Sequence, residues 1–356
     1  MNLAQSQPAQ PQQNQLQHPA NPAEPQASTF NHPDRFIQGW YWVMPSRPLK
    51  CGQVQPVTIL GRDLAVYRTA AGQVAIVDAY CPHMGAHLAE GCVDDEGLRC
   101  FFHNWRFDSQ GVCTDIPYLG HALPIRITTW PVVEHYGLIW VWTGDAPPPP
   151  PPFVPELENV VWDVALGKPF VHNCHPNVLM VNAIDAHHFN TVHNFPIEIV
   201  FKNEVVNESA IMFSNTTRGG DESWLVRLIQ PFYQHEGTYS MCYSYGSTGT
   251  VTLGPDFLHF YIVFALRLGP DGTTEGQPIF VTQRRSGVSG WLFNRVVLWL
   301  TQQVGNYFAK GDTKIFQTIK FDLKTPLKAD QSILQFMHHV EGQQALQYGS
   351  WEAVTA

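Results

Sequence analysis

The sequence predicts an α+β protein: a small antiparallel β domain followed by a larger domain in which helices cover an antiparallel sheet. Between residues 36 and 143, short runs of β-branched and aromatic residues alternate with turn residues, as in small β domains. Further along, helical stretches precede and follow a series of strand-like runs, which favours helices gathered on one side of a sheet. Six consecutive prolines separate the two patterns.

Length and composition limit the classes of function. A chain of 356 residues is long enough for two domains with separate hydrophobic cores. Only 14% of its residues are charged, against ~25% in typical soluble domains, and 44% are hydrophobic. The formal net charge of −9 argues against a nucleic-acid partner, which requires a basic face. Seven cysteines without a pairing pattern indicate a reducing compartment, so we expect a cytoplasmic protein.

The N-terminal segment, residues 1–35, is predicted to be a disordered tail rich in Gln and Pro. It lacks a basic stretch followed by an apolar core, so no signal peptide is expected. No apolar run in the chain reaches about 18 residues without a charge, so no transmembrane helix is expected either.

The first domain is predicted to span residues 36–146 and to consist of antiparallel strands. Val57–Leu60 and Leu64–Arg68 flank a turn that begins with glycine, which is a hairpin signal. Val74–Asp78 is predicted to be the next strand, and Gly137–Trp142 is predicted to close the domain as a buried strand.

Two Cys-His pairs of mixed spacing carry the strongest chemical signal. Cys81 is followed two residues later by His83, and Cys100 is followed three residues later by His103. A zinc ribbon would pair cysteines as C-x-x-C. One thiolate and one imidazole in each loop instead suit a Rieske [2Fe–2S] cluster, in which the cysteines hold one iron and the histidines hold the other. A hairpin predicted over Trp105–Asp115 places the second loop at the tip of a small β domain.

The proline run Pro147–Pro152 is predicted to be an extended spacer, because proline lacks the N–H group that sheets and helices need. The composition changes on both sides of this run. We therefore assign residues 147–155 to a linker and residues 156–347 to the second domain.

The second domain is predicted to begin with short strands and a helical stretch around Leu179–His193. Apolar strands follow, namely Trp224–Ile229, Phe257–Leu266 and Pro278–Thr282. This order of elements is the basis for expecting an antiparallel sheet with helices on one face.

Two late helices are expected at Trp291–Lys310 and Thr313–Leu323. Within the first, Trp291–Leu300 is largely apolar but contains Arg295, so it is too short and too charged to span a bilayer. Two arrangements stay open for this amphipathic segment, since such a helix either packs on the core or lies on a membrane surface.

A second group of ligand-type residues lies inside the helical stretch. Asp185 and His188 are three residues apart and would share one helix face. His188 and His193 are five apart, which is about 140° around a helix, so they can share a metal only if the helix unwinds locally or contains a π-bulge. Two histidines and one carboxylate form the facial triad of non-haem Fe(II) oxygenases.

Together these motifs resemble those of Rieske non-haem iron oxygenases, of the ring-hydroxylating α-subunit type, over roughly Phe36–Gln347. Asp78–Gly91 and Phe101–Arg106 are most similar to the branch of 3-ketosteroid 9α-hydroxylases and cholesterol 7-desaturases. The resemblance implies a small Rieske domain, a helix-grip catalytic domain and a homotrimer in which the cluster of one subunit serves the iron of the next. It also implies that the catalytic carboxylate of Asp185 bridges the two sites.

The resemblance further implies a third iron ligand from a late helix, for which the chain has two candidates. Asp312, in the stretch Asp-Thr-Lys-Ile-Phe, matches the pattern that supplies the ligand and is preferred. Asp330 resembles a second aspartate that is not a ligand. Either residue could instead be a helix N-cap, which is a common structural role for aspartate.

Two departures from the family pattern concern the cluster loops. Asn104 stands where glycine is usual after the second cluster histidine, and asparagine tolerates a positive φ. Ala86 and Phe102 occupy the positions of the cysteine pair that braces respiratory-chain Rieske loops, so that disulfide is not expected.

The expected function is that of an oxygenase with Fe(II) held by His188, His193 and Asp312. It would use O₂ and electrons from a separate reductase or ferredoxin to hydroxylate or desaturate a bulky hydrophobic, sterol-like substrate. The donor is expected to be a separate protein because no flavin or nicotinamide fingerprint is visible. Two alternatives stay open: a Rieske electron-transfer protein fused to a hydrophobic-ligand domain without catalytic iron, and a zinc-stabilised interaction protein.

Overall fold

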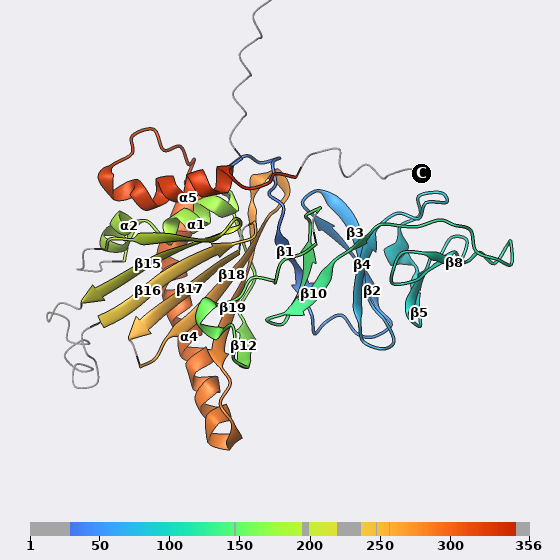
Figure 1. Ribbon diagram of the computed structural model, residues 1–356, viewed down its shortest axis with the longest axis horizontal. Coiled ribbons are helices and arrows are strands. Elements are labelled where there is room, and N and C mark those ends of the chain that lie inside the picture. The colour runs from blue at the N-terminus through green and yellow to red at the C-terminus, as the bar shows by residue number, and fades with distance from the viewer. Residues whose placement is uncertain are drawn as a thin grey trace, which may run out of the picture.

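The computed structural model describes residues 29–145, 147–193, 199–218, 236–246, 248–255 and 257–346. The predicted strand Trp224–Ile229 and residues 1–28 of the predicted tail lie outside this part. Figure 1 shows a half made of small sheets beside a half made of one large sheet with helices. This arrangement confirms the predicted α+β class.

Three small antiparallel sheets form the first half, with the orders β1-β11-β10, β2-β3-β4-β9 and β5-β6-β7-β8. The strands are β1 Trp40–Pro45, β2 Val54–Ile59, β3 Arg62–Arg68, β4 Val74–Asp78, β5 Cys92–Asp94, β6 Gly97–Arg99, β7 Arg106–Phe107, β8 Cys113–Asp115, β9 Thr129–Trp130, β10 Val132–His135 and β11 Leu138–Trp142. The predicted hairpins are present, since β2 pairs with β3 and β7 pairs with β8.

One eight-stranded antiparallel sheet dominates the second half, in the order β12-β19-β18-β17-β16-β15-β14, with β13 also paired to β19. Its strands are β12 Trp162–Leu166, β13 Phe170–His172, β14 Lys202–Asn207, β15 Ala210–Arg218, β16 Glu236–Ser244, β17 Thr248–Pro255, β18 Phe260–Leu268 and β19 Thr274–Gln283. The proline run lies between β11 and β12. The domain limits placed there stay a prediction.

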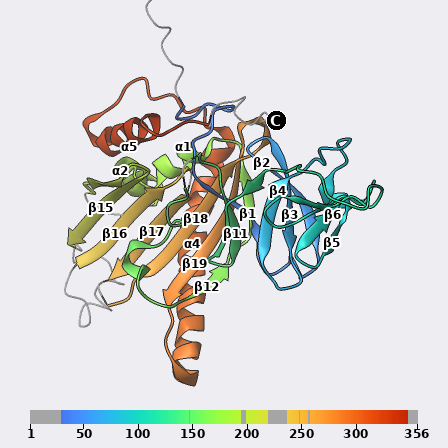
Figure 2. The ribbon, with the colours of Figure 1, turned by 45° about the vertical axis from the view of Figure 1, so that its right-hand side comes forward.

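The two faces of this sheet bury different partners, because successive side chains of a strand point to opposite faces. Ile262 and Phe280 belong to a core shared with the helices α1 Pro176–Asn182, α4 Gly287–Thr318 and α5 Gln331–Glu341. Val263 and Val281, one residue further along the same strands, pack instead with the tryptophans of β1 and β11. Figure 2 shows β1 and β11 lying against the large sheet. Leu268 at the end of β18 likewise packs with Tyr41 and Val43 of β1. The two halves are therefore joined by buried apolar side chains.

Arg267 on β18 links the two halves by polar contacts. Its guanidinium donates to the carbonyl oxygens of Trp42 and Val43 at 3.0 and 2.9 Å, and it pairs with Glu275 at 2.7 Å. It also lies over the Trp42 ring, 4.2 Å from the ring centroid. Burial lowers the pKa of Arg267, whereas Glu275 favours the charged form. At the contact between the halves, the Arg267 side chain thus supplies the hydrogen bonds that two β1 carbonyl groups would otherwise make with water.

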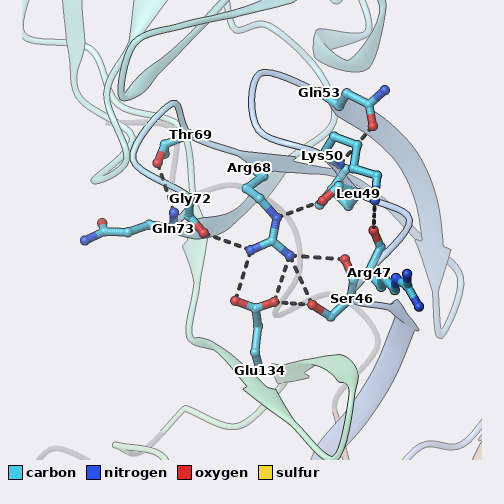
Figure 3. Close-up of polar contacts among 10 residues, drawn as sticks. All are labelled: Ser46, Arg47, Leu49, Lys50, Gln53, Arg68, Thr69, Gly72, Gln73 and Glu134. Carbon is cyan, nitrogen blue, oxygen red and sulfur yellow. Dashed lines mark hydrogen bonds and ion pairs between the residues drawn. The ribbon is translucent and has the colours of Figure 1, made fainter. Parts of the chain in front are cut away.

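A second arginine organises the first half internally. Figure 3 shows the guanidinium of Arg68, at the end of β3, between Glu134 of β10 and the loop that follows β1. It donates to Leu49 O and Gly72 O at 2.8 Å and to Glu134 Oε1 at 2.7 Å. Glu134 also accepts from the Ser46 hydroxyl. These bonds join the sheet β2-β3-β4-β9, whose strand β4 leads into the Cys81 loop, to the sheet β1-β11-β10.

The two predicted late helices are wrong in their limits, because α4 runs without a break from Gly287 to Thr318. Glycine inside a helix costs only about 1 kcal/mol, so Gly311 does not end it. Asp312 and Phe316 are buried beyond that glycine, and their packing favours a continuous helix. The predicted Thr313–Leu323 helix is the end of α4, and α5 was not predicted.

The helical stretch predicted over Leu179–His193 is two short helices, α1 and α2 Ala186–Thr191. Asp185 is the N-cap of α2, where its Oδ1 accepts from the backbone N–H of His188 at 3.1 Å. The expectation that Asp185 and His188 share a helix face is therefore wrong: aspartate satisfies a free N–H group better before the first turn than within it. Among the described helices, none is long and apolar enough to cross a bilayer.

Candidate metal centres

The two cysteine loops have the same backbone geometry despite their different spacing. In the first loop Gly85 donates from its N–H to Cys81 O at 2.9 Å, and in the second Asn104 donates to Cys100 O at 3.0 Å. The closing residue has positive φ in both, 75° at Gly85 and 58° at Asn104. Asn104 thus occupies the left-handed region, as expected for an asparagine in place of glycine.

The four side chains of these loops lie at different depths. Cys81 and Cys100 are buried, whereas His83 and His103 are exposed. The two imidazole rings are 4.5 Å apart between centroids, and His83 stacks on Trp105 at 4.6 Å with 7° between the planes. Two thiols inside and two adjacent imidazoles outside match the donor set of a cluster with one cysteine-held and one histidine-held iron.

The surroundings of the thiols favour a bound cation. Burial, together with the neighbouring Cys100, raises the pKa of the Cys81 thiol to about 11, although a backbone hydrogen bond at His83 opposes the shift. A metal ligand must be the thiolate, whose charge needs compensation at this depth. The four side chains therefore fit a [2Fe–2S] cluster, although the assignment of these residues as ligands stays a prediction.

The second constellation brings together three residues that are distant in the sequence. His188 Nε2 and His193 Nε2 are 3.0 Å apart. Asp312 Oδ1 is 3.0 Å from the first and 3.1 Å from the second. All three residues are buried. Since α2 ends at Thr191, His193 lies beyond the helix, which is the local unwinding that the five-residue spacing required.

The chemistry of this group fits a divalent metal. Asp312 Oδ1 is buried and accepts no hydrogen bond, although two imidazole nitrogens lie near it. Burial lowers the pKa of His193, so its ring favours the neutral form that binds metals, while Asp312 opposes this shift. His188 Nε2 lies within hydrogen-bond distance of His193 Nε2 and of the Asn182 amide, at 3.0 and 3.1 Å. Three ligand atoms that converge on one point suit a cation, and two histidines with one carboxylate suit Fe(II).

The structure separates the two aspartates that the sequence left open as third ligand. Asp312 reaches the histidines from the middle of α4. Asp330 instead lies in a 3₁₀ turn before α5, where its Oδ2 accepts from Leu327 N at 2.7 Å. Of the two, Asp312 therefore has the ligand geometry and Asp330 has a capping role.

An apolar cavity of about 430 Å³ opens beside His188, His193 and Asp312. Its sheet wall is formed by Val251, Leu253, Ile262, Phe264 and Phe280. Its polar wall residues are Lys168, His172, Asn182, Gln302 and Asn306. The sequence analysis named none of these as cavity residues. On α4 a signal existed, because Gln302, Asn306, Ala309 and Thr313 follow one another at spacings of four, three and four residues, which places them on one side of the helix that carries Asp312.

Comparisons with known proteins show similarity to Rieske proteins. Residues 39–132 match the Rieske [2Fe-2S] domain family. The chain is 32% identical over 193 residues to the oxygenase component of 3-ketosteroid-9-alpha-monooxygenase from Rhodococcus rhodochrous, covering 52% of this chain and 49% of the relative. It is 38% identical over 167 residues to cholesterol 7-desaturase nvd from Bombyx mori, covering 46% and 36%. The alignments thus span about half or less of these relatives.

Solved structures extend the fold similarity to most of the chain. Pseudomonas putida CBB5 NdmB superposes with a TM-score of 0.64 at 15% identity, covering 85% of this chain and 89% of that chain. Dicamba monooxygenase bound to dicamba superposes with a TM-score of 0.60 at 20% identity, covering 86% and 96%. The predicted resemblance to Rieske oxygenases, including the ketosteroid 9α-hydroxylase and cholesterol 7-desaturase branch, is therefore confirmed.

Proposed function

We propose that this chain is a Rieske-type oxygenase that hydroxylates or desaturates a bulky hydrophobic, sterol-like substrate at a mononuclear iron. The observation that carries the proposal is the buried group His188, His193 and Asp312 at the wall of an apolar cavity. The names of the curated relatives, a 3-ketosteroid monooxygenase and a cholesterol desaturase, support the sterol-like substrate.

Each group of residues has a separate part in this function. Cys81, Cys100, His83 and His103 would hold the cluster, which supplies single electrons when bound. His188, His193 and Asp312 would hold Fe(II), which supplies O₂ activation when bound. The cavity wall orients the substrate and excludes water, because it is formed mainly by aliphatic and aromatic side chains.

Asp185 is proposed to position His188 and to connect the two centres. Its Oδ1 holds the backbone N–H of His188 at the start of α2, which sets the direction of the imidazole. The side chain is only partly buried. A carboxylate oxygen at this place is available to a histidine of a neighbouring subunit.

The separation of the two centres supports a homotrimer with transfer between subunits. Figures 1 and 2 place the sheet β5-β6-β7-β8 and α2 at opposite ends of the molecule. Electron transfer within one chain would have to cross both halves, whereas a neighbouring subunit could bring its exposed His83 and His103 close to Asp185. The electrons are proposed to come from a separate reductase or ferredoxin in the cytoplasm.

The proposal is tested by the iron content of anaerobically purified protein. We expect about three irons per chain, two in the cluster and one at the histidine pair. His188→Ala should lose one iron and keep the visible bands of the cluster, and Asp330→Asn should keep all three. Conversion of cholesterol or a 3-ketosteroid, with a reductase and O₂, should be present in the wild type and Asp330→Asn only.

An electron-transfer protein without catalytic iron remains the second candidate. It predicts about two irons per chain in both the wild type and His188→Ala, because only the cluster would be loaded. That outcome would overturn the oxygenase proposal. A colourless chain that binds zinc in place of iron would overturn both candidates.

A further inference from the structure

The first half of α4 has apolar residues on two opposite faces. Asn294, Val297, Leu298 and Thr301 are buried against the large sheet. On the other face Val288, Leu292, Val296 and Trp299 follow each other at spacings of four, four and three residues, which places them in one stripe. These four side chains are 84%, 58%, 47% and 58% exposed. Figures 1 and 2 show this end of α4 projecting beyond the strands of the sheet.

Such a stripe is unusual for the solvent face of a helix. A helix that packs on a sheet by one face normally carries polar residues on the other. Here Trp291 and Phe293, on either side of the stripe, are also exposed, at 54% and 44%. A contiguous exposed apolar surface rimmed by charged residues is typical of a place where another molecule binds.

The charges around the stripe favour an anionic partner. Residues 276–311 contain no Asp or Glu, although the whole chain has a net charge of −9. Arg285 and Arg295 lie over the rings of Phe293 and Trp291, at 4.4 and 5.4 Å from the centroids. Among the ion pairs of the described residues, Arg284 pairs with Asp163, whereas neither Arg285 nor Arg295 takes part. Arg285 donates to Asn294 Oδ1 at 3.2 Å, which is a neutral partner, and Arg295 acts on Asp163 only at longer range. Two positive charges thus lie beside the apolar stripe.

Tryptophan, leucine and arginine on one helix are typical of segments that lie in the interface of a bilayer. The described part of the chain has no helix that could span a membrane, so the stripe suits a surface contact. The stripe also leads to the cavity, because Gln302, Asn306 and Ala309 continue along α4 from Trp299 and line the cavity. A hydrophobic molecule in the lipid would meet the cavity next to the docked helix.

We propose that the first half of α4 docks on an anionic lipid surface, with Val288, Leu292, Val296 and Trp299 inserted among the acyl chains and Arg285 and Arg295 at the headgroups. The docking itself does not depend on the proposed oxygenase activity. Only the suggestion that a substrate passes from the lipid along α4 into the cavity rests on the proposed oxygenase function.

Flotation of the full chain with vesicles tests the docking. The wild type should float with vesicles of phosphatidylcholine and phosphatidylserine, and less with phosphatidylcholine alone or at high salt. The double substitution Leu292→Glu and Trp299→Glu should lower the partition coefficient about tenfold or more, because it removes two inserted apolar groups and adds repulsion. Arg285→Gln with Arg295→Gln should remove only the preference for phosphatidylserine.

The matched control is Val200→Glu with Val205→Glu, which changes two equally exposed valines, at 64% and 62%, outside the stripe. It should float as the wild type does. All variants should keep the visible spectrum of the cluster and the circular dichroism of the wild type, which separates lost docking from lost folding. Loss of mononuclear iron would leave flotation unchanged, so failure of the two proposals is distinguishable.

Two results would overturn the docking proposal. One is equal flotation of the wild type and the Leu292→Glu, Trp299→Glu variant. The other is absence of wild-type flotation. In that case a lower mass of the variant by size-exclusion chromatography and light scattering would show that a second copy of the chain covers the stripe.

Discussion

The two candidate metal centres are built in opposite ways. The cluster loops are local: each is closed by a hydrogen bond from a residue of positive φ to the carbonyl oxygen of its own cysteine. The second centre joins the end of α2 to the middle of α4 and depends on how these helices pack. Local loops can be recognised from short motifs, whereas a constellation that spans the fold requires the fold to be known. The two centres should therefore respond differently to mutation.

The largest expected effect separates the two centres directly. If the proposed function holds, Asp312→Ala should remove the mononuclear iron and lower turnover of the proposed sterol-like substrate by at least about a hundredfold, because one of the three proposed protein ligands is lost. The cluster should remain, since its residues lie in the other half of the chain. Iron analysis and the visible spectrum check this prediction, and Asp330→Ala serves as control. Loss of the cluster bands in Asp312→Ala would contradict the independence of the two centres.

The contact between the two halves should be more sensitive than a surface ion pair. Arg267→Ala should lower the free energy of unfolding by about 3 kcal/mol, because Glu275 and two β1 carbonyl groups lose a buried partner. Arg284→Ala, at the more exposed pair with Asp163, should cost at most about 1 kcal/mol. Urea denaturation of both variants measures the difference. Equal effects would show that Arg267 does not stabilise the contact.

Acid should weaken the first half through His135 at the end of β10. Burial lowers the pKa of His135 from 6.5 to about 4. Above pH 6.5 His135 is neutral in both the folded and the unfolded chain. Between pH 6.5 and 4 its imidazole binds a proton only in the unfolded chain, so the free energy of unfolding falls as the pH falls. Because His135 is partly exposed, we expect its protonation to lower the free energy of unfolding by roughly 2 kcal/mol over this pH range.

His135→Phe should flatten that part of the curve of unfolding free energy against pH. His175 contributes a separate acid-sensitive term, since burial lowers its pKa to about 3. An unchanged slope between pH 6.5 and 4 in His135→Phe would show that His135 is protonated in the folded protein.

The smallest expected effect concerns the second cluster loop. Asn104→Ala should destabilise the loop by about 1 kcal/mol, because alanine disfavours the positive φ of this position, whereas Asn104→Gly should be neutral or slightly stabilising. The temperature at which the visible cluster bands disappear measures the stability of the loop in each variant. If alanine and glycine behave alike, the loop does not depend on this backbone conformation.

Recognition from the sequence succeeded where the signal is short. The cysteine loops, the β2-β3 and β7-β8 hairpins and the strand β4 have local turn or strand signals and are found where expected. Prediction from the sequence failed where tertiary packing determines the limits of a helix. The break between α1 and α2 is stabilised from outside, since Ser332 of α5 donates its hydroxyl to Ile184 O at 2.8 Å. Nothing near Ile184 in the sequence indicates that contact.

The residue types and spacings of this chain were sufficient to recognise a Rieske-type domain and an α+β fold and to predict a histidine pair suited to iron, because these depend on neighbouring residues. Only the tertiary structure placed Asp312 rather than Asp330 beside the histidines, since both aspartates precede apolar residues and differ mainly in what α4 and α5 pack against. The cavity and the exposed stripe on α4 also required it. Whether an apolar helical residue is buried depends on which face meets the sheet, and the periodicity of a helix with two apolar faces does not contain that information.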